Sequence, residues 1–124
     1  MKPLPPKLPG VSYIYGLVDP RINKVRYVGE ALYPTGRLAA HFSAPELAKT
    51  TYRAKWVGKL FRLGLRPRMV VLEKCDVAVW QARETWWIAY YRRLNGNLMT
   101  NATDGGEGWH GMKHSEAERS RNLG

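Results

Sequence analysis

Val11-Ser12-Tyr13-Ile14-Tyr15-Gly16-Leu17-Val18 predicts the first β-strand of the 124-residue chain, because β-branched and aromatic residues dominate this stretch. The five residues that follow, Asp19 to Asn23, have the composition of a turn. Lys24 to Glu30 then predicts a returning strand, so the three stretches together indicate a β-hairpin.

The hairpin contains two tyrosines at equal distances from its expected centre near Arg21. A symmetric register places Tyr15 and Tyr27 directly across from each other, on one face of the sheet. Such a pair either stabilises the hairpin by packing or presents two hydroxyl groups at a site. Gly29, at the end of the second strand, indicates a bulge or a close approach of the backbone.

Helical and extended patterns alternate along the rest of the chain. Pro34-Thr35-Gly36 opens a short helix with Thr35 as its expected cap, and a second helix begins near Thr51. A third strand is predicted from Arg68 to Leu72. The longest helix follows from Val77 to about Leu94, with Asp76 as its cap.

This order of elements predicts an α+β fold with a small, central, antiparallel three-stranded sheet flanked by helices. A chain of this length is expected to form one folded domain, which we place over residues 11–106. Residues 1–10 are proline-rich and predict an extended lead, and residues 107–124 form a separate tail.

The charge of the chain indicates a polyanionic partner. Twenty Lys and Arg residues against ten Asp and Glu residues give a net charge of +10, and no acidic residue lies between Glu46 and Glu73. At helical spacing, the basic residues of this interval predict one positive face, which either binds a DNA backbone or is simply solvated. The predicted DNA-binding residues are Lys49, Arg53, Lys55, Lys59, Arg62 and Arg66.

Other features exclude several classes of protein. A single cysteine excludes a disulfide framework and a zinc site built from several cysteines. The longest apolar run, Trp86 to Tyr91, is too short to cross a bilayer, and the first residues lack the apolar segment of a secretory signal. We therefore expect a cytoplasmic monomer without a membrane partner.

Three polar residues depart from their local patterns. Glu84 falls within the aromatic stripe of the long helix, where a carboxylate needs a cation, a metal or a proton; a salt bridge or a place at the edge of the stripe would also explain it. Arg37 and His41 are four residues apart and project from one side of the short helix, as surface or packing residues also do. With the two tyrosines, these groups suit the hydrolysis of a phosphodiester.

In their order along the chain, these residues resemble the GIY-YIG nuclease family. Its first hallmark stands as Tyr13-Ile14-Tyr15, with Tyr in place of the leading Gly, and its second as Tyr27-Val28-Gly29, with Val in place of Ile. The other matching positions are Arg37, His41, Glu84 and Asn101. The resemblance implies a DNA endonuclease that uses one divalent ion, Mg²⁺ or Mn²⁺, and no small-molecule cofactor.

The resemblance also implies a role for each residue. Glu84 would bind the metal ion, which contacts the scissile phosphate and the 3′ leaving oxygen. Tyr15 would activate water as the general base with help from His41, because a free tyrosine has a pKa near 10; His41 acting directly is the alternative.

The other three positions would support this chemistry. Tyr27 would orient the phosphate or the water, and Arg37 would stabilise the developing negative charge. Asn101 would hold the local geometry through hydrogen bonds.

The tail carries a second resemblance. Gly111 to Arg119 is similar to the small nuclease-associated modules of phage-type homing endonucleases, with Ser115 and Glu118 as a capping box. This favours a homing endonuclease acting on duplex or branched DNA over a restriction or structure-specific repair nuclease of the same fold. A zinc site of Cys75, His110 and His114 is a weaker interpretation of the same region.

Two interpretations from other classes stay open at this point. A basic DNA-binding module without catalysis would keep the positive face and use the tyrosines and Glu84 for packing. A ribosome-associated protein would prefer RNA, although nothing in the sequence resembles an RNA-recognition motif.

Overall fold

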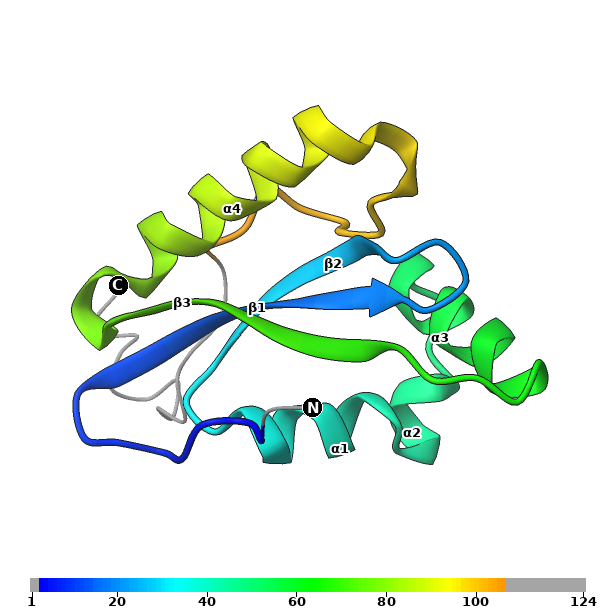
Figure 1. The fold of residues 1–124 in the computed structure, drawn as a ribbon, viewed down its shortest axis with the longest axis horizontal. Coiled ribbons are helices and arrows are strands. Elements are labelled where there is room, and N and C mark those ends of the chain that lie inside the picture. Colours follow the sequence, from blue (N-terminus) through cyan, green and yellow to red (C-terminus); the bar gives the residue numbers. More distant parts are fainter. Residues whose placement is uncertain (1–2, 107–124) are drawn as a thin grey trace.

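The computed structural model describes residues 3–106, so the predictions made for the tail, Ser115, Glu118, His110 and His114 among them, lie outside the described residues. Strands β1 (Val11–Asp19), β2 (Lys24–Ala31) and β3 (Arg68–Asp76) form an antiparallel sheet in the order β2-β1-β3 (Figure 1). The predicted α+β fold with a three-stranded sheet is confirmed.

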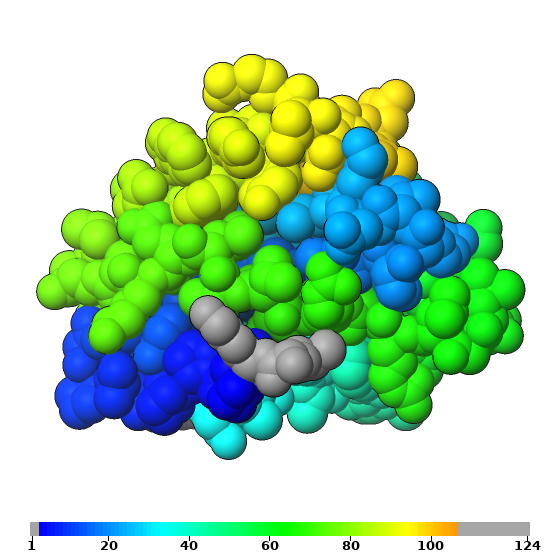
Figure 2. All heavy atoms as spheres, in the orientation of Figure 1, coloured from blue at the N-terminus to red at the C-terminus, as the bar shows by residue number. Residues whose placement is uncertain are grey.

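Helices flank this sheet. They are α1 (Pro34–His41), α2 (Ala44–Leu47), α3 (Tyr52–Arg62) and α4 (Trp80–Asn95), with short 3₁₀ helices η1 (Val77–Val79) and η2 (Gly96–Leu98) at the two ends of α4. In Figures 1 and 2 the tip of the β1–β2 hairpin lies between α3 and the C-terminal end of α4.

The central strand β1 contributes to two cores, one on each face of the sheet. Tyr15 and Leu17 pack with Trp56, Val57 and Leu60 of α3. On the opposite face, β1 contributes two residues to a cluster that α4 covers, consisting of Ile14, Val18, Val25, Val28 and Ile88. The sheet therefore separates α4 from the layer that contains α3.

The register of the hairpin differs from the symmetric one. Tyr15 pairs with Gly29 and Leu17 pairs with Tyr27, so the prediction that the two tyrosines lie directly opposite each other is wrong. The ladder passes from Leu17–Tyr27 to Val18–Val25 and skips Arg26, which is the extra residue of a β-bulge. This offset of two residues keeps both tyrosines on the same face of the sheet.

Several local predictions also need correction. Thr35 does not cap α1; Tyr33 occupies that position without a side-chain bond, and Pro34 starts the helix. Asp76 caps the 3₁₀ helix η1 rather than the long helix. The long helix, α4, begins at Trp80, three residues after the predicted start at Val77. Arg66 is not on the basic face of α3, because this helix ends at Arg62.

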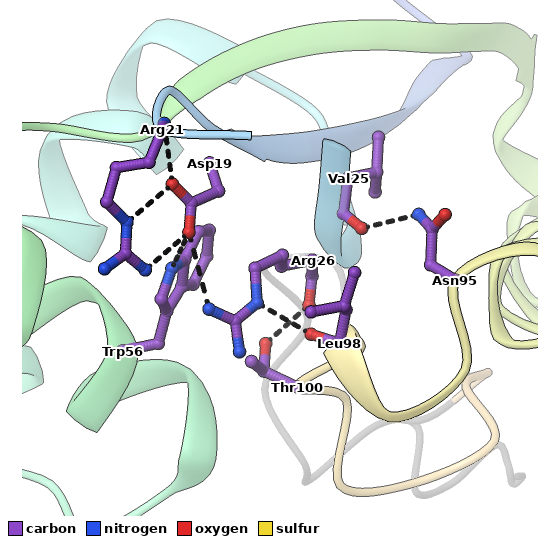
Figure 3. Close-up of polar contacts among 8 residues, drawn as sticks. All are labelled: Asp19, Arg21, Val25, Arg26, Trp56, Asn95, Leu98 and Thr100. Carbon is purple, nitrogen blue, oxygen red and sulfur yellow. Dashed lines mark hydrogen bonds and ion pairs between the residues drawn. The ribbon is translucent and has the colours of Figure 1, made fainter. Parts of the chain in front are cut away.

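Asp19, at the end of β1, is a fully buried carboxylate at the base of the hairpin turn. It accepts hydrogen bonds from Nε of Arg21 at 3.0 Å, from Nη1 of Arg26 at 3.4 Å and from Nε1 of Trp56 at 3.0 Å (Figure 3). The bond from the Arg21 side chain holds the pKa of Asp19 well below its usual value, against burial, which raises it. This carboxylate thus ties the turn, the bulge and α3 together.

No helix within residues 3–106 has the length and apolar character that crossing a membrane requires.

We expect Asp19→Asn to lower the free energy of unfolding at pH 7 by about 2–3 kcal/mol, because the donor groups of Arg21, Arg26 and Trp56 then face a neutral amide. The depressed pKa gives a stabilisation that is present above the unfolded-state pKa near 4 and is lost as the pH falls below it. Urea unfolding should therefore show the difference at pH 7 and a smaller one at pH 3. The control is Asp104→Asn in an exposed ion pair with Arg92; an equal loss there would contradict the prediction.

Candidate functional site

Side chains from six elements surround one cavity of about 310 Å³. Five of the six predicted catalytic residues line it: Tyr15 from β1, Tyr27 from β2, Arg37 and His41 from α1, and Glu84 from α4. The fold thus collects these groups, which are up to 69 positions apart in the sequence, around one space.

Tyr15 and His41 form the buried side of this cavity. The Tyr15 hydroxyl and Nε2 of His41 lie 2.6 Å apart in a hydrogen bond, and the exposed fractions of the two residues are 1% and 5%. Burial, together with the positive charges of Arg53 and Arg37, lowers the pKa of His41 to about 3, so the imidazole is neutral at pH 7. Burial also raises the pKa of Tyr15 well above its usual value. The resting pair is a neutral phenol on a neutral imidazole.

Gly29 makes room for this pair. A Cβ at Gly29 would lie 2.5 Å from the Tyr15 hydroxyl oxygen and 2.9 Å from the ring of Tyr27. The close backbone approach predicted for this glycine is confirmed, and the Tyr15 ring lies where a side chain at position 29 would be. The two tyrosine rings are 6.2 Å apart.

Glu84 lies on the buried face of α4 between Trp80 and Ile88, as its place in the aromatic stripe predicts. Its Oε1 accepts a hydrogen bond of 2.7 Å from the backbone N–H of Gly106. Gly105 and Gly106 both have positive φ angles, and a Cβ at Gly105 would lie 2.7 Å from Ile88. The loop of Gly105 and Gly106 therefore holds the Glu84 carboxylate in place.

Two carboxylates in the cavity were not anticipated. Glu30 accepts a hydrogen bond of 2.7 Å from Ser12, and burial, with a smaller contribution from Glu84, raises its pKa to about 7. Glu46 forms ion pairs with Lys49 and Arg53. The sequence signal for Glu30 is its position directly after Tyr27-Val28-Gly29, but only the fold shows that it faces Glu84 rather than solvent.

Asn101 does not line the cavity. Its side chain accepts a hydrogen bond of 3.0 Å from the N–H of Val28 and donates one of 2.8 Å to the carbonyl of Val28. Asn101 thus acts as an extra hydrogen-bonding partner along β2, beside Tyr27 and Gly29. Its predicted role, local geometry, agrees with this contact.

The predicted DNA-binding residues do not form one face. Arg53 lines the cavity with its guanidinium 5.4 Å from the Tyr27 ring, and Lys49 pairs with Glu46. Arg66 lies over the Phe61 ring at 4.4 Å. The remaining three, Lys55, Lys59 and Arg62, are exposed on α3.

The carboxylates of this cavity could hold a divalent ion only together with water and phosphate. Within residues 3–106, no group of three or more His, Cys, Asp or Glu side chains could hold a metal ion. Magnesium, however, is commonly bound through one or two carboxylates, several waters and substrate phosphates. Glu84, with Glu30 in the same cavity, supplies that donor set.

Comparison of the chain with protein-family models, curated proteins and solved structures gave no match in any of the three searches.

We expect Gly29→Ala to displace the Tyr15 ring and to lower the free energy of unfolding by about 1–3 kcal/mol, because the new methyl group overlaps a buried side chain. The matched control is Gly58→Ala in α3, where the nearest atom to a Cβ is 3.7 Å away and alanine favours the helix by up to about 1 kcal/mol. Urea unfolding of both variants measures the effect. Equal stabilities would contradict the close approach.

We expect the ring protons of His41 to keep the chemical shifts of a neutral imidazole from pH 8 to pH 5, because its pKa lies near 3. Proton NMR measures this directly, and His41→Gln assigns the resonance among the three histidines. A midpoint near pH 6.5 would show that the imidazole is exposed and charged below that pH.

Proposed function

We propose that the chain is a metal-dependent DNA endonuclease of the GIY-YIG type, which hydrolyses phosphodiester bonds. The observation that carries this proposal is the convergence of Tyr15, Tyr27, Arg37, His41 and Glu84 on one cavity. The hydrogen bond between Tyr15 and His41 supports it most directly, because it joins a hydroxyl group to a neutral proton acceptor.

In this proposal, Tyr15 and His41 act as one unit. Neutral Nε2 of His41 accepts the Tyr15 proton while the Tyr15 oxygen takes a proton from the attacking water. The raised pKa of Tyr15 makes a free phenolate unavailable at rest, so the proton must leave as the water is deprotonated. This coupling favours Tyr15 with His41 over either residue alone.

Arg37 and Tyr27 receive the phosphate. Arg37 is exposed at the mouth of the cavity, where an incoming phosphate can reach its guanidinium. Its fixed positive charge stabilises the additional negative charge of the transition state. The half-buried Tyr27 orients the phosphate or the water.

Glu84 would hold the metal ion, with its carboxylate positioned by the Gly106 N–H. When bound, a divalent ion supplies positive charge at the phosphate and at the 3′ leaving oxygen. Attack of the deprotonated water on phosphorus breaks the bond to the 3′ oxygen, which takes up a proton. The products are a 3′ hydroxyl and a 5′ phosphate.

We expect Glu84→Gln to reduce the nicking of supercoiled plasmid at least about 100-fold in Mg²⁺ or Mn²⁺, because the amide does not replace a metal-binding carboxylate. Glutamine still accepts the Gly106 N–H, so the variant should fold and bind DNA. The control is Glu73→Gln on β3, which changes the net charge equally but lies outside the cavity and pairs with Arg83.

Wild-type protein with EDTA completes the experiment. The nuclease is supported if wild type and Glu73→Gln cleave the plasmid, Glu84→Gln does not, and EDTA abolishes the cleavage. A folded wild type that binds DNA and never cleaves it supports the alternative, a DNA-binding module without catalysis.

A further inference from the structure

A second, larger cavity of about 760 Å³ lies between α3 and the segment from Gly96 to Thr100, at the edge of β2. Two of its lining residues form the hydrogen bonds drawn in Figure 3: Arg26 donates to the carbonyl of Leu98 at 2.8 Å, and Thr100 donates to the carbonyl of Arg26 at 2.7 Å. We call this cavity the basic pocket. None of the proposed catalytic residues lines it.

Positive charge dominates the basic pocket. Its described lining holds five cations, Arg21, Arg26, Lys55, Lys59 and Arg92, and no acidic side chain. Three of these cations already form ion pairs: Arg21 and Arg26 with Asp19, and Arg92 with Asp104. Lys55 and Lys59 form no ion pair with any described residue, so these two ammonium groups are available to an anion.

Two aromatic residues line the pocket, and they differ in availability. Trp56 is 5% exposed, donates its indole N–H to Asp19 and has the Arg26 guanidinium 5.2 Å above its ring. Tyr52, in the first turn of α3, is 70% exposed. An exposed ring beside two unpaired lysines is the combination with which proteins bind the base and the phosphate of single-stranded nucleic acid.

The basic pocket adjoins the catalytic cavity through consecutive residues. Tyr52 lines the pocket and Arg53 lines the cavity, and along β2 the same is true of Arg26 and Tyr27. The bulge at Arg26 directs its side chain toward the pocket while Tyr27 stays on the catalytic face.

We propose that the basic pocket binds an unpaired nucleotide of the DNA substrate, with its base stacked on Tyr52 and its phosphates near Lys55 and Lys59. This inference depends on the proposed nuclease only because it places that nucleotide next to the bond that is cleaved. The expected substrate is then DNA that contains a single-stranded segment, rather than continuous duplex DNA.

The first test measures binding of a labelled thymidine oligonucleotide of about 15 residues to the full chain in EDTA, by fluorescence anisotropy. Tyr52→Ala should weaken binding roughly ten-fold, and Tyr52→Phe should restore it, because stacking needs the ring and not the hydroxyl. An abasic strand of the same length should bind both variants equally. A loss of affinity that is the same for both strands would overturn the stacking role.

The second test measures the salt dependence of the same binding. The double variant Lys55→Gln/Lys59→Gln should reduce the slope of log K against log salt by about 1.4, which corresponds to two lost contacts with a single strand. The control, Lys7→Gln/Lys74→Gln, removes the same charge from exposed lysines outside both cavities. Equal slopes in the two double variants would overturn the phosphate contacts.

These measurements separate the two proposals. If the wild type cleaves plasmid and the Tyr52 and Lys55/Lys59 variants bind single strands as well as it does, the nucleotide-binding role of the pocket is overturned and the nuclease stands. If these variants bind single strands more weakly and the wild type never cleaves DNA, the pocket is supported and the nuclease is overturned.

Discussion

The burial of β1 is the constraint on which the rest of the structure depends. Every residue from Ser12 to Asp19 is buried, because β1 has a strand on each side and helices cover both faces of the sheet. Its polar groups therefore need partners inside the protein. Tyr15 meets His41 of α1, and Asp19 meets Arg21, Arg26 and Trp56. The first of these contacts lies in the candidate catalytic cavity, and the partners of Asp19 in the second line the basic pocket.

The sequence predicts the elements of this fold well because each has a strong local signal. The hairpin follows from β-branched and aromatic residues around a turn, and the burial of Glu84 follows from the helical spacing of its aromatic neighbours. The register could not be predicted, since the extra residue at Arg26 depends on the contacts of its side chain with Asp19 and Leu98. No local pattern in the sequence records that dependence.

In the candidate site, too, features with a local sequence signal were predictable and features that depend on tertiary contacts were not. Residues at helical spacing, such as Arg37 and His41, are expected on one side of α1 and do share the cavity. The basic face fails because it assumes that α3 continues to Arg66, whereas the helix ends at Arg62. Glu30 and Arg53 line the cavity because of the tertiary packing of β2 and α3. The charge pattern of the sequence does not predict this packing. The two cavities therefore differ in charge: five cations and no acidic side chain line the basic pocket, whereas Arg37 and Arg53 face three glutamates in the other cavity.

The Asp19 carboxylate also determines which parts of the chain open together. Its hydrogen bonds join the hairpin turn to α3, and Arg26 extends the network to the 98–100 segment through Leu98 and Thr100. Breaking the network at any member exposes donors that the others had satisfied, so these segments behave as one cooperative unit. In native-state hydrogen exchange, the amides of the turn, α3 and Thr100 would therefore share a single opening free energy, although they lie up to 80 residues apart along the chain.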